Sequence, residues 1–237
     1  LLARRIEAAA LEGGATVTAT AACVQVAPDA PPAPSMRALR FALDSFIKDG
    51  PAAAKSSFDS VLQKTVAQAG AFTSMVEDRR FSLVYQPVGD LDDWSLHHCE
   101  VRARCEKGQS PAETIRMAEE LEIIEDFDFA VLERAIRLLK SGVSKDLNLA
   151  VNVSARSLMH DDFMSALARV TKAETALKDR LLFEITESTA LDNLETANAR
   201  IQTLRNHGFA VCLDDFGSGG ASLAYLKALA VDIVKID

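Results

Sequence analysis

From Phe81 onward, the chain alternates between short apolar runs and longer segments with apolar residues at three-to-four spacing. The short runs predict buried strands, and the spaced segments predict amphipathic helices. The predicted strands are 81–88, 94–105, 147–154, 181–186, 209–213 and 233–237, and the predicted helices are 111–124, 126–140, 161–172, 194–207 and 222–229. A turn at 89–93 lets the first two strands form a hairpin. The later strands alternate with helices, which predicts a parallel sheet built from βαβ crossovers.

Residues 1–70 have a different pattern and carry no motif with catalytic chemistry. We predict a helix at 1–12, a strand at 15–26, a stiff proline-rich connector, and helices at 35–48 and 56–75. Ser35 is the expected N-cap of the helix at 35–48. We therefore expect 1–70 to be part of a small α/β regulatory domain with a connecting helix, and 72–237 to be a separate domain. Because the chain begins without Met and ends in a predicted strand, we also expect it to be part of a longer protein.

Composition narrows the choice of partners. The 237 residues carry a formal net charge of -8, which argues against a nucleic-acid polymer as the main partner. No apolar run reaches the roughly 18 residues of a membrane span. The four cysteines show no CxxC spacing, so we expect reduced, structural thiols, as in the cytoplasm.

Asp214 and Asp215 directly follow the apolar run 209–213 and precede a glycine-rich turn. Two adjacent carboxylates repel each other, and burying either one is costly without a cation. A metal ion is one way to compensate. The alternative is an ordinary strand-end turn in which an aspartate caps the next helix.

Other polar residues also lie near the carboxyl ends of predicted strands, where a (β/α) barrel has its active site. They are Glu100, Arg104, Asn152, Glu184, Glu187, Asp214, Asp215 and Lys235. Carboxylate and amide oxygens suit Mg²⁺ or Mn²⁺ better than zinc. The four histidines, His97, His98, His160 and His207, are scattered, and we expect surface or packing roles for them rather than ligand roles.

The ordered motifs YQPV, CEVRAR, SPAETIRMAEELEII, LAVNVS, FEITES, LDDFGSGGASLAYL and VKID resemble the EAL domain over about residues 72–237. That family contains cyclic-di-GMP phosphodiesterases of bacterial second-messenger signalling and their inactive relatives. The resemblance implies an α/β fold, a TIM-like barrel, here incomplete at the carboxyl end and preceded by a small α/β remnant. Residues 1–70 show a weaker resemblance to the tail of a GGDEF domain.

The resemblance also implies roles for individual residues. Glu100, Asn152, Glu184, Asp214 and Asp215 match metal ligands of a two-metal Mg²⁺ or Mn²⁺ site, and Asp215 would serve the second metal. Lys235 matches a lysine that contacts the attacking water or the phosphate, and Glu187 matches a glutamate that holds the loop after the aspartates. Gln86 and Arg104 match residues that bind guanine or phosphate of cyclic-di-GMP. Family members commonly form homodimers.

The sequence departs from the family pattern at several positions. Arg102 replaces the leucine of the name motif, where a cation could contact a substrate phosphate or crowd the pocket. Gly220 replaces an aromatic residue, Glu122 replaces a glycine, and two further barrel strands are expected beyond Asp237. The resulting expectation is hydrolysis of cyclic-di-GMP to linear pGpG. The alternatives are an inactive receptor that binds cyclic-di-GMP or a protein partner, and a purely structural interaction domain.

Overall fold

The computed structural model describes residues 8–12, 14, 16, 32–48, 58–105, 111–142, 146–171, 175–186, 194–217 and 223–236. Apart from residue 16, the predicted strand at 15–26 lies outside the described residues, as do Glu187 and Gly220. The chain divides into two compact units, Leu1–Gly70 and Ala71–Asp237. The boundary falls within helix α3 (Phe58–Glu77).

In the first unit, helix α2 runs from Pro32 to Lys48. It begins three residues earlier than predicted, so Ser35 lies inside the helix and the assignment of Ser35 as N-cap was wrong. Pro32 and Pro34 fall in the first helical turn, where a missing backbone N–H costs no intrahelical hydrogen bond. The proline-rich stretch thus starts the helix instead of serving only as a connector.

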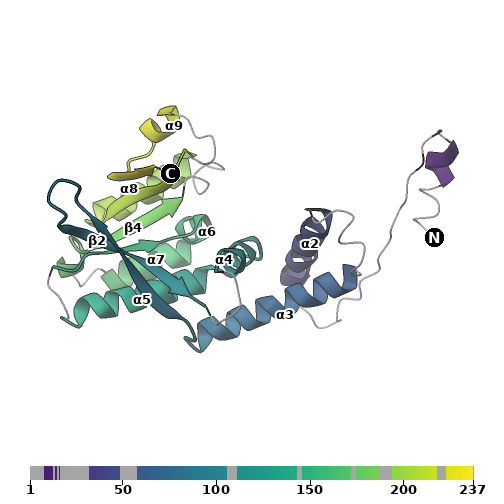
Figure 1. Cartoon of the computed structure of the whole chain (residues 1–237), viewed down its shortest axis with the longest axis horizontal. Coiled ribbons are helices and arrows are strands. Elements are labelled where there is room, and N and C mark those ends of the chain that lie inside the picture. The colour runs from purple at the N-terminus through teal and green to yellow at the C-terminus, as the bar shows by residue number, and fades with distance from the viewer. Residues whose placement is uncertain are drawn as a thin grey trace. The chain divides into compact units, whose positions relative to one another are not determined.

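The second unit contains a six-stranded sheet with its strands in chain order (Figure 1). The strands are β1 (Ser82–Gly89), β2 (Leu96–Arg104), β3 (Leu149–Asn152), β4 (Leu181–Thr186), β5 (Ala210–Phe216) and β6 (Ile233–Ile236). β1 and β2 form the predicted antiparallel hairpin, and every later neighbour pair is parallel. The predicted parallel sheet with βαβ crossovers is therefore confirmed.

The helices between the strands are α4 (Pro111–Glu120), α5 (Glu125–Lys140), α6 (Ala155–Met159), α7 (Asp161–Thr171), α8 (Leu194–Asn206) and α9 (Leu223–Ala228). α4 ends before the predicted position, because Glu122 adopts a left-handed conformation with φ of 59° that a helix cannot contain. The short helix α6 was not predicted. Its N-cap is Ser154, whose hydroxyl accepts a hydrogen bond from the Ser157 backbone N–H.

The core lies between the sheet and these helices. Leu149, Val151, Phe183, Val211 and Leu213 on the central strands are fully buried. α5 packs on β3 and α8 packs on β5. A near-continuous apolar run in each central strand is what burial on both faces of a parallel sheet requires.

Phe127 of α5 joins the start of the sheet to the end of α3. Its ring lies 5.5 Å from that of Phe72 and 5.2 Å from that of Phe81, measured between centroids. Arg134 stacks over Phe81 at 4.2 Å and donates to the carbonyl oxygens of Arg79 and Phe81. These contacts fix the segment that leads into β1. Within the described part of the chain, no helix is both long and apolar enough to cross a bilayer.

Candidate metal centre

Side chains of alternate residues point to the same face of a strand, and residues paired in register share a face. Asn152 of β3 is in register with Glu184 of β4, and Thr186 of β4 with Asp214 of β5. Because the strands are parallel, their carboxyl ends meet at one edge of the sheet. The structure therefore places these predicted polar residues on one face at that edge.

Three carboxylates from three different strands converge there. Glu100, Glu184 and Asp214 each offer one oxygen, and these oxygens all lie within 4.8 Å of one another. Glu184 is fully buried and Glu100 is 4% exposed. Such a group of buried carboxylates requires a compensating cation.

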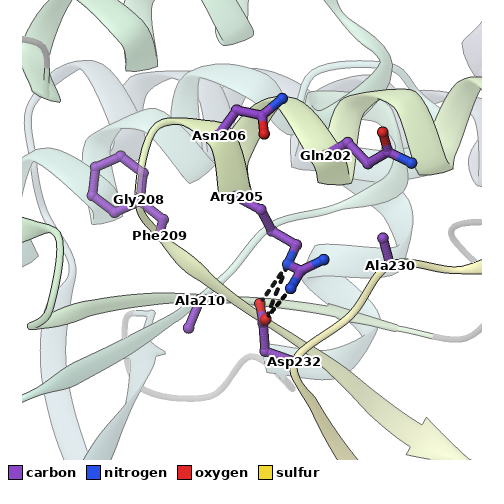
Figure 2. Close-up of a pocket in the computed structure, with 8 residues that line it drawn as sticks. All are labelled: Gln202, Arg205, Asn206, Gly208, Phe209, Ala210, Ala230 and Asp232. Carbon is purple, nitrogen blue, oxygen red and sulfur yellow. Dashed lines mark hydrogen bonds and ion pairs between the residues drawn. The ribbon is translucent and has the colours of Figure 1, made fainter.

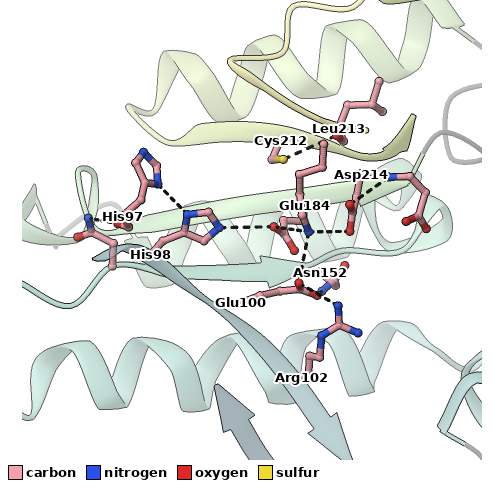
Figure 3. Close-up of polar contacts among 12 residues, drawn as sticks. His97, His98, Glu100, Arg102, Asn152, Glu184, Cys212, Leu213 and Asp214 are labelled. Atoms are coloured by element: carbon pink, nitrogen blue, oxygen red, sulfur yellow. Dashed lines mark hydrogen bonds and ion pairs between the residues drawn. The ribbon is translucent and has the colours of Figure 1, made fainter. Parts of the chain in front are cut away.

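Figure 3 labels the three carboxylates Glu100, Glu184 and Asp214. Lys235 of β6 supplies one compensating charge to this cluster. Its Nζ lies 2.9 Å from Asp214 Oδ2, 3.1 Å from Glu184 Oε1 and 3.3 Å from Glu100 Oε2. Burial lowers the pKa of Lys235, but the hydrogen bond to Asp214 and the charges of Glu184 and Glu100 outweigh it and raise the pKa above its ordinary value. Lys235 is therefore a permanent cation near neutral pH.

Glu100 has donors on both carboxylate oxygens. Arg102 donates from its guanidinium to Oε2 at 3.0 Å, the same oxygen that Lys235 contacts. The side-chain amide of Asn152 lies 3.4 Å from Oε1, with its nitrogen assigned as the donor. An amide in this position can also offer its oxygen to a cation.

The cluster also raises the pKa of a neighbouring thiol. Cys212 lies beside Glu184 in the β4–β5 register. Burial, followed by the charges of Glu184, Asp214 and Glu100, raises the pKa of Cys212 to about 12, against the opposing effect of Lys235. The thiol therefore remains protonated, in agreement with a structural cysteine.

The remaining predicted site residues are more exposed. Gln86 of β1 lies opposite Glu100, and Arg102 and Arg104 follow Glu100 on the same face of β2. Gln86, Arg102 and Arg104 thus form an exposed polar margin beside the carboxylates. Asp215 adopts a φ of 56°, and its backbone N–H donates to Asp214 Oδ1 at 3.0 Å. Its carboxylate is not a member of the three-carboxylate cluster.

One buried residue beside the cluster was not predicted to be near it. The imidazole of His98 is 5% exposed, and its Nε2 lies 3.8 Å from Glu184 Oε1. Its Nδ1 lies 2.7 Å from Nδ1 of His97, so one of these two nitrogens donates to the other. The clue in the sequence was the alternation of β2, because residues 98, 100 and 102 share one face.

The donor set fits a hard divalent cation. Three carboxylates and one amide provide the oxygen ligands that Mg²⁺ and Mn²⁺ prefer. Glu184 Oε2 is buried without a hydrogen-bond partner among the described residues. A bound cation would satisfy this oxygen.

A separate hollow of about 610 Å³ lies at the opposite end of β5, where the strand begins (Figure 2). Arg205 and Asp232 form an ion pair there, with an Nη2–Oδ1 distance of 2.7 Å. Asp232 also accepts a hydrogen bond from the Val211 backbone N–H at 2.9 Å. The polar groups of Arg205 and Asp232 bond to each other and to the backbone. We therefore place the candidate site at the carboxylate cluster.

The fold and the cluster define a class of protein: an incomplete (β/α) barrel with an acidic cluster, suited to a cation, at the carboxyl edge of its strands. The EAL domain family profile matches residues 69–237. The chain belongs to the EAL domain family. The predicted family and the incomplete TIM-like barrel are both confirmed.

The relatives extend beyond this chain. The cyclic di-GMP phosphodiesterase PdeB of Shewanella oneidensis is 32% identical over 169 residues, which are 68% of this chain and 20% of PdeB. The chain spans about a fifth to a quarter of the length of the first curated relatives it matches.

Solved structures give the same fold. The PaMucR phosphodiesterase in its c-di-GMP complex has a TM-score of 0.63 and 29% identity, covering 72% of each chain. The FimX EAL domain from Pseudomonas aeruginosa bound to c-di-GMP has a TM-score of 0.62 and 28% identity, covering 73% of this chain and 71% of that chain.

Proposed function

We propose that the unit from Ala71 to Asp237 hydrolyses cyclic-di-GMP to linear pGpG at a divalent metal site, as part of bacterial second-messenger signalling. The observation that carries the proposal is the convergence of Glu100, Glu184 and Asp214 within 4.8 Å at one edge of the sheet. The names of the relatives supply the substrate class.

Glu100, Asn152, Glu184 and Asp214 would hold Mg²⁺ or Mn²⁺, and Asp215 would serve a second ion. When bound, these ions would neutralise the charge on a phosphodiester and supply an activated water. The carboxylates come from different strands of a packed sheet, so their positions are fixed before a ligand arrives. Such preorganisation lowers the cost of binding the developing charge of the transition state.

Lys235 and the exposed margin act on the substrate. The ammonium of Lys235 donates to a phosphate oxygen or to the attacking water. Arg102 and Arg104 present guanidinium groups suited to phosphate, and Gln86 presents an amide suited to a guanine edge. Glu187 would hold the loop after the aspartates.

The second candidate function is a receptor that binds cyclic-di-GMP without hydrolysing it. Two observations favour it: the Asp215 carboxylate is not in the cluster, and Arg102 occupies an oxygen of Glu100. In this case the phosphates would bind Arg102 and Arg104 directly. The acids would remain neutralised by Lys235.

The deciding experiment incubates the full-length protein with cyclic-di-GMP and Mg²⁺ or Mn²⁺ and follows pGpG by chromatography. We expect pGpG from the wild type and none from Glu184→Gln, which removes a buried ligand charge. Glu195→Gln is the matched control, because Glu195 is an exposed carboxylate on α8, and it should retain turnover. If the protein binds cyclic-di-GMP but forms no pGpG, the receptor function would hold and the hydrolase function would be refuted. If it does not bind cyclic-di-GMP at all, both candidate functions would be refuted.

A further inference from the structure

Glu100 is the ligand residue with the most crowded carboxylate. Its Oε2 contacts two cations at once, Arg102 at 3.0 Å and Lys235 at 3.3 Å. Its Oε1 faces the Asn152 amide at 3.4 Å. A divalent cation that uses Glu100 must therefore share or displace donors already in place.

The two cations differ in how firmly they are held. Lys235 contacts three carboxylates, and its side chain is 27% exposed. Arg102 has an ion pair with Glu100 alone among the described carboxylates, and its side chain is 44% exposed. A guanidinium with an exposed side and one ion pair is easier to displace than an ammonium with three ion pairs. Arg102 is thus the cation that leaves most easily.

We propose that Arg102 exchanges between Glu100 and a phosphate of the bound nucleotide, and thereby couples metal binding to nucleotide binding. The divalent cation and the phosphodiester are the ligands of the proposed function, on which this inference rests. While Arg102 is paired with Glu100, it competes with the metal for Oε2. When a phosphate binds Arg102, the carboxylate is released for the cation.

The chemistry of the groups supports this exchange. Guanidinium matches phosphate in a two-point hydrogen-bonded geometry, so a phosphate is a strong competitor for Arg102. Strand alternation keeps residues 100 and 102 on the same face, so Arg102 can move to a ligand at the exposed margin without a backbone change. By linkage, each ligand must raise the affinity for the other by the same factor.

The first test uses Mn²⁺ alone, with free Mn²⁺ measured by electron paramagnetic resonance during titration of the full-length protein. Arg102→Leu should bind Mn²⁺ about fivefold more tightly than the wild type, the size expected for loss of one half-exposed competing ion pair. Arg104→Leu is the matched control. It removes the same charge two residues along the same strand face, but the Arg104 guanidinium contacts the Ala103 carbonyl at 3.4 Å instead of Glu100.

The second test repeats the titration with saturating pGpG, which carries the phosphodiester but is the end product. Mn²⁺ affinity should rise in the wild type and stay constant in Arg102→Leu. Arg102→Gln, which removes the charge but keeps a polar side chain, should show the same loss of coupling and guards against a folding defect in the leucine variant.

Equal Mn²⁺ affinity in the wild type and both Arg102 variants would overturn the inference, as would an equal gain in Arg104→Leu. An equal effect of pGpG on the wild type and the Arg102 variants would overturn the coupling. Failure of the proposed function would give a different result. If the wild type forms no pGpG, the titration with Mn²⁺ alone would still show whether Arg102→Leu binds Mn²⁺ more tightly than the wild type.

Discussion

Asp128 makes the stability of the barrel unit depend on pH. This buried carboxylate of α5 accepts hydrogen bonds from the Ser154 backbone N–H at 2.9 Å and the Ser157 hydroxyl at 2.7 Å. Burial raises the pKa of Asp128 from 3.8 to about 6, although the bonds from Ser154 and Ser157 oppose the rise, and the nearby Glu125 adds to it. The cost of burying the charge therefore exceeds the gain from the hydrogen bonds.

The sign of the effect follows from proton binding. Between pH 3.8 and about 6, the folded state holds a proton on Asp128 that the unfolded state has lost. Stability from this group is therefore greatest at low pH, falls as the pH rises to about 6, and stays low above that. The difference between the two pKa values corresponds to about 3 kcal/mol.

Asp128→Asn removes the charge but keeps an oxygen that can accept from Ser154 and Ser157. We expect the variant to gain up to about 3 kcal/mol over the wild type as the pH rises from about 4 to about 7. Urea unfolding should be followed by far-UV circular dichroism, because the single tryptophan, Trp94, is already 83% exposed in the folded state.

Asp126→Asn is the control, because it removes an exposed carboxylate from the same helix. Its free energy of unfolding should follow the wild-type pH dependence. The reasoning would be refuted by parallel pH curves for the wild type and Asp128→Asn. In that case, Asp128 would be equally ionised in the folded and unfolded states.

Three further predictions concern individual contacts. Lys235→Met leaves three carboxylates facing one another, so the free energy of unfolding of the metal-free protein should fall by about 3 kcal/mol or more. Mn²⁺ should restore much of the thermal stability. An unchanged melting temperature without metal would contradict this. Glu122→Gly should raise the free energy of unfolding in urea by about 1 kcal/mol. Relief of the left-handed φ of Glu122 should outweigh loss of its partly exposed ion pair with Arg156 at 3.0 Å. A clear loss of stability would show that the ion pair has the stronger effect. Cys212, with a pKa of about 12, should resist iodoacetamide in the native protein and react only in denaturant, as peptide mass spectrometry can show; rapid native labelling would argue against its burial.

The centre of the sheet was predictable because its strands are buried. The strand predicted at 181–186 coincides with β4 (Leu181–Thr186), a continuous apolar run interrupted only by Glu184 near its carboxyl end. The strand predicted at 209–213 proved longer, since β5 continues through the two aspartates to Phe216. Polarity suggested an end there, whereas backbone pairing with β6 resumes at Phe216 after an irregularity.

The candidate site was predictable as a set of residue types but not as a set of contacts. Strand ends placed Glu100, Glu184 and Asp214 together, and the structure brings their oxygens within 4.8 Å. Sequence could not show that Asp215 remains outside this group, because its left-handed φ of 56° depends on the local turn. Strand alternation puts His98 on the face of Glu100, but the sequence could not show that His98 is buried, because its burial depends on neighbouring strands.

The direction of β1 determines at which edge the chain that leaves α3 joins the sheet. β1 is antiparallel to its neighbour, and Ser82 at its start pairs with Arg104 at the end of β2. The polypeptide leaving α3 thus crosses only residues 78–81 before it joins the sheet at the edge that carries the carboxylates. A movement of the last turn of α3 would therefore act first on β1, and through its pairing on Arg102 and Arg104 of β2, which lie beside the carboxylates.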